Sequence, residues 1–235
     1  MSASPTAVRG LVDIFVAPRD ALQSAYDHPR RLWLPLIIVI AAMSGFWVWY
    51  YQTVDFNWLV DHFLSMSGRE MTPEQMEAAR GFMSPMSMTI QSVIGVVVFT
   101  FAMSAIIALY FHIVAKVSGF REMEYGRWFS LVAWAGFPTI LVIAGMALNF
   151  ALSDSGQVPP ERLAVTNLAN LLGLDMSEPG WQRTLGSFDL VMLWQIFLMG
   201  LGVSMYMKKR LATGIVIAAI PTVLFYGVSL LVAVL

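Results

Sequence analysis

Residues 89–114 read TIQSVIGVVVFTFAMSAIIALYFHIV and contain no aspartate, glutamate, lysine or arginine. This run of 26 residues exceeds the roughly 20 that an α-helix needs to cross the hydrocarbon core of a bilayer. A segment inside lipid must satisfy its own backbone hydrogen bonds, which a helix does. The stretch therefore predicts a transmembrane helix.

Four other segments are long and apolar enough to do the same, and they cover residues 32–51, 128–151, 188–207 and 211–235. Asp189, near the start of its segment, is the only formally charged side chain in the five. The chain of 235 residues is 58% hydrophobic and 12% charged, with a mean hydropathy of +0.69. A soluble domain carries about 25% charged residues. We therefore expect an all-α integral membrane protein with five transmembrane helices.

Basic residues are concentrated on one side of this arrangement. Ten of the 14 lysines and arginines fall on the side of the N-terminus if all five segments span, and we call them the basic collar: Arg9, Arg19, Arg30, Arg31, Lys116, Arg121, Arg127, Lys208, Lys209 and Arg210. Cytoplasmic loops carry the excess of positive charge in membrane proteins. We therefore expect the N-terminus in the cytoplasm and the C-terminus outside.

The first 31 residues are expected to form a cytoplasmic amphipathic segment ahead of a membrane domain over residues 32–235. Val8, Leu11, Val12 and Phe15 recur at the spacing of one helical face. Pro18 interrupts this helix, and a second short helix follows. Such a helix either lies in the membrane interface or packs on its own bundle, and the sequence favours neither.

The two outer loops, residues 52–88 and 152–187, are expected to contain short amphipathic helices. Residues 55–67 have apolar residues at helical spacing. Thr72 and Gln75 match a capping box at the start of another helix. A third helix is expected to open at Pro160 and to end before Gly173. These helices would cover the outer face of the membrane domain.

Three stretches of the chain occur in a characteristic order. The first is FVAP at residues 15–18 with Pro29; the second is AKVSGF at 115–120 followed by WFSLVAWAGFP at 128–138; the third runs from Leu193-Trp194 through Gly200 and Gly202 to KKR at 208–210, Ala212 and Pro221. The order resembles the Yip domain family, the Ypt/Rab-interacting-protein superfamily of five-span membrane proteins. The second stretch is similar to the family's glycine-containing cytoplasmic loop and a following span with an internal proline.

This resemblance covers nearly the whole chain and implies a bacterial-type member in an inner membrane, without an established catalytic activity. Ser118-Gly119 stands where the family's loop commonly has paired glycines. The tyrosine-glycine-proline type motif that is linked with Rab binding in eukaryotic members is absent from the sequence. A Rab-type GTPase partner is therefore not implied.

No residue pattern predicts catalysis, a cofactor or a metal centre. The chain has no cysteine, and its predicted spans contain no metalloprotease motif and no serine–histidine arrangement. A net charge of −1 gives nucleic acid no electrostatic attraction. Met83, Met86 and Met88 leave Cu(I) capture as an alternative to ordinary apolar packing.

Four polar residues fall toward the outer half of the predicted spans: Gln91, Asn149, Asp189 and Gln195. Gln195 would lie about 10 Å in from its helix end, and the others within about 3 Å. They either line an outward-facing polar vestibule or form interhelical and headgroup hydrogen bonds. Asp189 also suits the N-terminus of its helix, with Ser187 as a candidate cap.

Pro138 and Pro221 lie near the middle of their predicted spans. Each removes a backbone donor and frees the carbonyl four residues earlier, so each is a candidate hinge or a static kink. Small residues four positions apart, at 41 and 45 and at 200 and 204, permit close helix contact within a protomer or in a dimer.

Two hypotheses of function follow. The first is a non-enzymatic membrane protein that acts through membrane lipids, another membrane protein or a second copy of itself. In it, Lys208, Lys209 and Arg210 contact anionic lipid or an acidic partner. The second is a transporter or channel for small solutes or lipids, which uses the polar vestibule and the hinges at Pro138 and Pro221.

Overall fold

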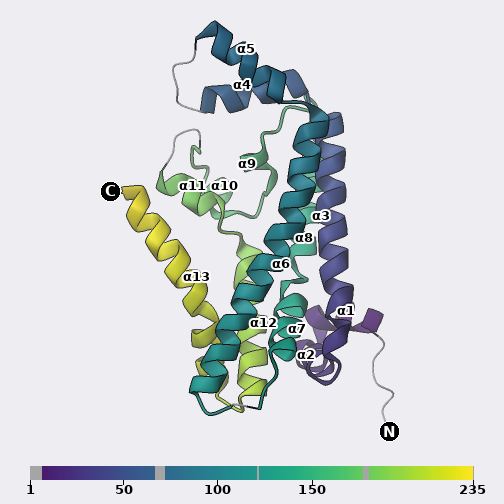
Figure 1. Ribbon diagram of the computed structural model, residues 1–235, viewed down its shortest axis with the longest axis vertical. Coiled ribbons are helices and arrows are strands. Elements are labelled where there is room, and N and C mark those ends of the chain that lie inside the picture. Colours follow the sequence, from purple (N-terminus) through teal and green to yellow (C-terminus); the bar gives the residue numbers. More distant parts are fainter. Residues whose placement is uncertain (1–6, 67–71, 121, 177–179, 235) are drawn as a thin grey trace.

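The computed structural model describes residues 7–66, 72–120, 122–176 and 180–234, and every regular element in these ranges is a helix. The helices form an elongated bundle with short helices at both ends (Figure 1). The lower end carries α1 (Ala7–Val16), α2 (Pro18–Asp27) and the 3-10 helix η1 (Pro29–Leu32). The upper end carries α4 (Phe56–Met66) and α5 (Pro73–Phe82).

Four helical segments are long and apolar enough to cross a membrane. They are Pro29–Thr53, which joins η1 to α3 (Trp33–Thr53); Pro85–Val117, which is α6; Tyr125–Ala151, which joins α7 (Tyr125–Gly136) to α8 (Thr139–Ala151); and Leu211–Ala233, within α13 (Leu211–Val234). The predicted all-α class is confirmed, and four of the predicted spans have matching helices.

The predicted span at residues 188–207 contains a shorter apolar helix. This helix, α12 (Leu190–Tyr206), has 17 residues and a length of about 25 Å at 1.5 Å per residue. A typical hydrocarbon core is about 30 Å thick. Its lower half is buried among the neighbouring helices, with Leu198, Leu201 and Val203 at most 2% exposed. A total of five spans therefore stays a prediction.

Helices α12 and α13 approach each other closely. A Cβ atom added to Gly200 would lie 2.6 Å from the Cα atom of Ile215, and one added to Gly214 would collide with the carbonyl oxygen of Gly200. The Cβ atom of Ser204 lies against Gly214 as well. The small residues at 200 and 204 therefore pack inside the protomer. At Gly45, an added Cβ would meet nothing within 4 Å in the described chain.

Helices α1 and α2 pack onto the lower end of the bundle. Ile14 of α1 and Leu22 of α2 are fully buried. The Tyr206 hydroxyl of α12 donates to the Leu22 carbonyl at 2.8 Å, and the Ser130 hydroxyl of α7 donates to the Ala25 carbonyl at 3.1 Å. The predicted interruption at residue 18 is confirmed, since α2 begins with that proline.

Two of the three helices expected in the outer loops are present as predicted. Helix α4 covers residues 56–66 of the predicted 55–67, and residue 67 lies outside the described residues. The capping box of α5 is confirmed: the Gln75 N–H donates to Thr72 Oγ1, and the Thr72 N–H donates to Gln75 Oε1. The single helix expected over 160–172 is wrong, because two four-residue helices occur instead: α9 (Pro160–Leu163) and α10 (Leu168–Leu171).

Backbone pairing with the start of α12 explains this interruption. The N–H of Leu168 donates to the Phe188 carbonyl at 2.8 Å, and the N–H of Leu190 donates to the Thr166 carbonyl at 3.1 Å. The Asn167 side chain then accepts from the N–H of residue 170 and starts α10. The N–H of Leu168 and the carbonyl of Thr166 are thus bonded to the start of α12 and not within one continuous helix. A last short helix, α11 (Trp181–Gly186), precedes α12.

The close approach of α12 and α13 yields a stability prediction. Gly214→Val should lower the free energy of unfolding by about 1–3 kcal/mol, because the added side chain has no space beside Gly200. Gly227→Val in the same helix is the matched control, since a Cβ there meets nothing within 4 Å. Denaturation in detergent measures both. Equal losses in the two variants would contradict the assigned packing.

Candidate functional site

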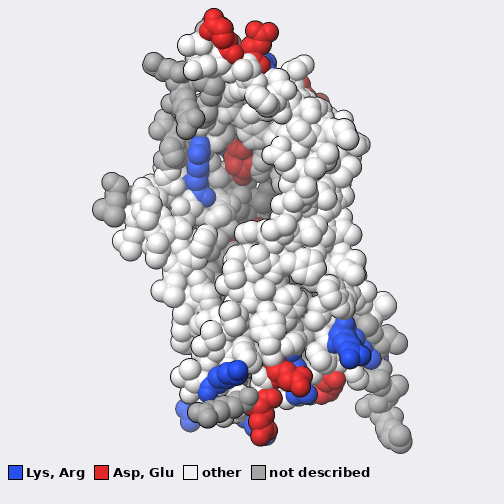
Figure 2. Space-filling view, viewed as in Figure 1, with Lys and Arg blue, Asp and Glu red and all other residues white. Residues whose placement is uncertain are grey.

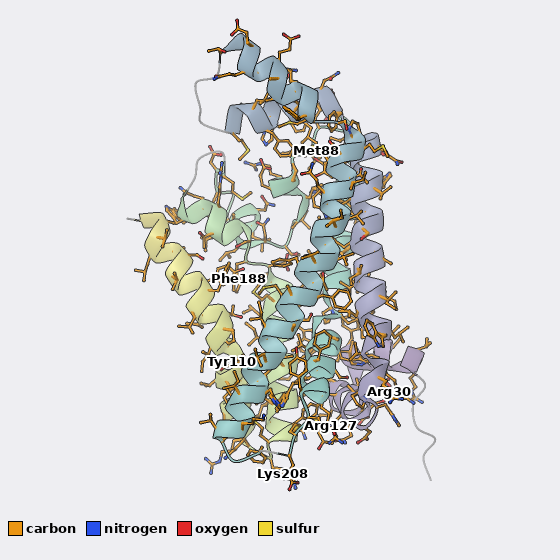
Figure 3. All side chains as sticks on the ribbon, viewed as in Figure 1. Arg30, Met88, Tyr110, Arg127, Phe188 and Lys208 are labelled. Atoms are coloured by element: carbon orange, nitrogen blue, oxygen red, sulfur yellow. The ribbon has the colours of Figure 1, made fainter. Side chains whose placement is uncertain are left out.

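Charged side chains gather at the two ends of the visible face, and a largely uncharged band separates them (Figure 2). Arg30, Arg127 and Lys208 all lie at the lower end (Figure 3). There α2 contacts α7 and α12, the helices that adjoin the α6–α7 loop and the α12–α13 turn (Figure 1). The lower end thus gathers parts of the basic collar that are distant in sequence; Arg121 lies outside the described residues.

Helix α12 ends in a Schellman turn that carries the three basic residues singled out from the sequence. The N–H of Lys208 donates to the Met205 carbonyl at 3.3 Å, and the N–H of Lys209 donates to the Ser204 carbonyl at 2.9 Å. This turn needs a left-handed backbone at its central residue, which glycine adopts without steric cost. Lys208 occupies that position with φ of 49° and is the only described non-glycine residue with a positive φ.

The α6–α7 loop begins with the same kind of turn. The N–H of Phe120 donates to the Ala115 carbonyl at 2.9 Å, and Gly119 takes the left-handed position with φ of 92°. The two turns touch, because the Lys209 ammonium lies 5.7 Å from the centre of the Phe120 ring. The glycine-containing loop noted in the sequence thus supports the basic turn directly.

Several other collar residues are engaged within the protein. Arg9 lies 3.7 Å from Asp13 in an ion pair along α1, and Arg31 donates to the Ser24 hydroxyl at 3.1 Å. The Arg127 guanidinium lies 4.4 Å from the centre of the Tyr26 ring. By contrast, the side chains of residues 208 and 210 are exposed and make no hydrogen bond or ion pair within the described ranges. The basic turn therefore leaves charge available to the surroundings.

Gln195, one of the four predicted vestibule residues, lies at the break between α7 and α8. Its amide donates to the Gly136 carbonyl at 3.3 Å and to the Thr139 hydroxyl at 2.8 Å. The Gly136 carbonyl lacks its helical partner, because the N–H of Ile140 bonds to the next carbonyl instead. Gln195 therefore satisfies the backbone at the break that Pro138 introduces.

The second proline, Pro221, stays inside the continuous helix α13. It has no N–H to offer to the carbonyl of Ile217, as the sequence indicates. The Tyr110 hydroxyl of α6 donates to that carbonyl at 2.9 Å. A side chain from a neighbouring helix thus replaces the missing donor at this proline as well.

Asp189, another of the four predicted vestibule residues, is the N-cap of α12. Its carboxylate accepts from the N–H of Val191 at 2.8 Å and from the Thr166 hydroxyl at 2.5 Å. The expected position at the helix start is therefore correct, but the cap is Asp189 and not Ser187, whose hydroxyl donates to the Thr184 carbonyl. A capping carboxylate also interacts favourably with the helix dipole.

Asn149 and Gln91 lie apart from these two. The Asn149 amide donates to the carbonyls of Arg162 and Leu163 at 2.9 and 3.0 Å, whereas Gln91 is exposed on α6. In the described chain, no hydrogen bond joins any two of the four residues. A cavity of about 420 Å³ adjoins Asn149 alone among them, and its lining is Asn149, Gln157, Val158, Pro159, Arg162, Val165 and Asn170.

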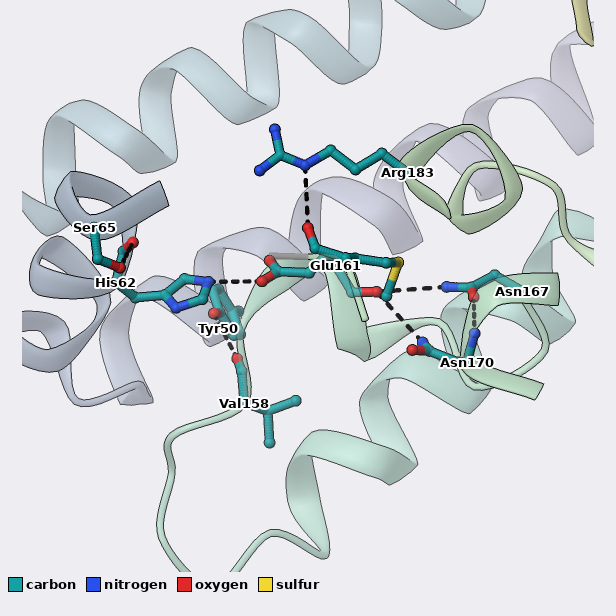
Figure 4. Close-up of polar contacts among 9 residues, drawn as sticks. Tyr50, His62, Ser65, Val158, Glu161, Asn167, Asn170 and Arg183 are labelled. Carbon is teal, nitrogen blue, oxygen red and sulfur yellow. Dashed lines mark hydrogen bonds and ion pairs between the residues drawn. The ribbon is translucent and has the colours of Figure 1, made fainter. Parts of the chain in front are cut away.

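A polar cluster that the sequence did not predict lies at the upper end (Figure 4). His62 Nε2 of α4 lies 2.6 Å from a carboxylate oxygen of Glu161 in α9, and the Tyr50 hydroxyl of α3 donates to the Val158 carbonyl at 2.8 Å. Roughly a hundred residues separate the partners in each pair. No local spacing could have indicated these contacts, because each joins segments that are far apart in the sequence.

The geometry of this cluster does not form a catalytic relay. The Ser65 hydroxyl donates to the backbone carbonyl of His62, not to its ring, and the Trp58 ring stacks on the imidazole at 5.5 Å. Nearby, the Gln157 amide donates to Asp55 at 2.9 Å and holds the pKa of that carboxyl below its usual range. These contacts attach α4 to the loop after α8.

The methionines of the copper hypothesis have different environments. Met86 is exposed, whereas Met88 packs against an apolar cluster around Tyr50 and Phe150. Across the described ranges, no group of three or more histidine, aspartate or glutamate side chains is placed to hold a metal ion.

Gln195 and Gln91 provide a matched test of the vestibule. Gln195→Leu should lower the free energy of unfolding by about 1–3 kcal/mol, because it leaves the Gly136 carbonyl without a partner. Gln91→Leu, at an exposed position, should change stability little. Denaturation in detergent compares them. A stable Gln195→Leu variant would contradict the assigned role of this side chain.

Comparison with known proteins gives one family. The model of the Yip1 domain matches residues 12–233, which is nearly the whole chain. No curated protein and no solved structure shows a significant match. Because the matched region extends from α1 to the last turns of α13, the chain belongs to the Yip1 domain family.

Proposed function

We propose that this multi-pass membrane protein has no enzymatic activity and acts through lipid or membrane-protein partners at its lower end. The observation that carries the proposal is the left-handed backbone of Lys208. A non-glycine residue in this conformation costs about 1–2 kcal/mol, and residues held in such conformations concentrate at functional sites. The turn keeps a charged lysine where glycine would be more stable.

Anionic lipid headgroups are the partner whose chemistry fits this turn best. The exposed charges of Lys208, Lys209 and Arg210 follow one another in a tight turn between α12 and α13, so they lie close to one surface. Each basic residue near an anionic leaflet contributes about 1 kcal/mol. An acidic membrane protein or a second copy of the chain is the other class of partner, and crosslinking in native membranes distinguishes it from lipid.

The proposed orientation places the lower end in the cytoplasm and the C-terminus outside. The distribution of lysine and arginine supports it, because positive charge accumulates on the cytoplasmic side. The proposed location is a bacterial inner membrane, and its support is the resemblance of the sequence to the family. A Rab-type GTPase is not part of the proposal.

A transporter is the second candidate, and the 420 Å³ cavity beside Asn149 is the observation that favours it. A solute pathway would have to continue from this cavity into the apolar band. Gln195, the deepest of the four predicted vestibule residues, is hydrogen-bonded to the break between α7 and α8. This bonding favours the proposal of a protein that acts through partners over that of a transporter.

The lipid proposal predicts the behaviour of the basic turn. The triple variant Lys208→Gly, Lys209→Gln and Arg210→Gln should retain less phosphatidylglycerol after extraction from mixed phosphatidylglycerol–phosphatidylethanolamine vesicles. The expected decrease in affinity is about fivefold for each charge removed. Native mass spectrometry counts the retained lipids, and Arg162→Gln at the upper end is the control.

Lys208→Gly alone separates charge from backbone strain. This variant should be more stable by about 1 kcal/mol, because glycine relieves the left-handed strain, yet it should retain less anionic lipid. Unchanged lipid retention in both the single and the triple variant would show that the collar only sets topology.

A further inference from the structure

Helix α1 carries an apolar edge that the bundle does not cover. Val8, Val12 and Val16 are 67%, 61% and 73% exposed. Their spacing of four residues places them along one side of the helix. Leu11 and Phe15, which share a predicted face with Val8 and Val12, instead pack partly against the core. The face expected from the sequence is therefore divided between the protein and the surroundings.

The position of α1 prevents this edge from turning inward. A Cβ atom added to Gly10 would lie 2.9 Å from the Trp134 ring, so the backbone of α1 rests directly on α7. The Phe15 ring lies 6.0 Å from the Phe137 ring, and Ile14 is fully buried. The inner side of α1 is thus fixed, and the valine edge must face outward.

The start of α3, next to α1, also exposes apolar side chains. Helix α1 contacts α3 and lies beside its lower end (Figure 1). Trp33 and Ile37, in the first two turns of α3, are 52% and 57% exposed. They belong to a candidate membrane span, so they are exposed apolar side chains on a segment suited to contact with lipid. Helix α1, whose valine edge is exposed, therefore lies beside a candidate membrane span.

Basic side chains accompany the edge. Arg9 follows Val8 in sequence and its side chain is 74% exposed, and the exposed Arg19 follows at the start of α2. Apolar residues beside exposed arginines are typical of helices that lie at the boundary between headgroups and acyl chains. If α1 lay in water, the three valines would stay exposed to solvent, and no apolar contact would offset the cost of that exposure.

We infer that the Val8–Val12–Val16 edge of α1 is inserted into the acyl chains of the leaflet at the lower end. The occupant is lipid and not a protein partner, because three valines offer far less than the roughly 800 Å² per partner that a stable protein interface buries. This inference goes beyond the proposed function, since it concerns apolar insertion of α1 and not the charge of the α12–α13 turn.

Spin labels on single cysteines test the insertion, and the absence of native cysteine makes each label unique. The protein carries Val12→Cys or Val16→Cys and is reconstituted in phosphatidylglycerol–phosphatidylethanolamine vesicles. Power saturation then compares accessibility to oxygen, which partitions into acyl chains, with accessibility to a water-soluble nickel chelate. Both positions are exposed, so a label at either one does not disturb the packing of α1 on α7.

Two control positions calibrate the measurement. Val98→Cys lies on the exposed side of α6 within a candidate span, and Gln23→Cys lies on the exposed side of α2. The labels at 12 and 16 should be accessible to oxygen and protected from nickel, as at 98. Nickel accessibility equal to that at 23 would place the edge in water and overturn the inference. Protection from both reagents would indicate a protein partner and would overturn it as well.

Discussion

The structure depends on one constraint: backbone groups inside a bilayer must find hydrogen-bond partners within the protein. At each of two prolines, a backbone carbonyl lacks its helical partner, and a side chain from another helix bonds to that carbonyl. The Gln195 amide donates to the Gly136 carbonyl where α7 gives way to α8, and the Tyr110 hydroxyl donates to the Ile217 carbonyl beneath Pro221. Each bond also connects helices that are distant in sequence, so these polar contacts help to fix the arrangement of the bundle.

Several polar side chains bond to the backbone of the helices and not to one another. Gln195, Tyr110 and Asp189 serve the backbone of the helices, and α12 lies against α13 with no space for even a Cβ at Gly214. These contacts therefore have a structural role. At the lower end, the turn between α12 and α13 exposes charged side chains.

Local patterns predicted local structure well. The apolar segments, the break at Pro18, the capping box of α5 and the position of Asp189 all follow from nearest neighbours along the chain. Features set by tertiary contacts could not be predicted in the same way. The His62–Glu161 pair joins helices α4 and α9, and the interruption between α9 and α10 depends on pairing with residues 188–190. The hydrogen-bond partners of Gln195 depend on the side of α12 from which its side chain projects. The position of Gln195 along the predicted span does not determine that side.

The proposed topology puts the two charged ends on opposite sides of a membrane. Labelling of single cysteines with a membrane-impermeant thiol reagent, in right-side-out and inverted vesicles, tests this directly. Glu124→Cys lies at the lower end and Glu77→Cys at the upper end, and both positions are exposed. Glu77→Cys should be labelled only in right-side-out vesicles and Glu124→Cys only in inverted ones. Labelling of both cysteines from the same side would contradict the proposed topology.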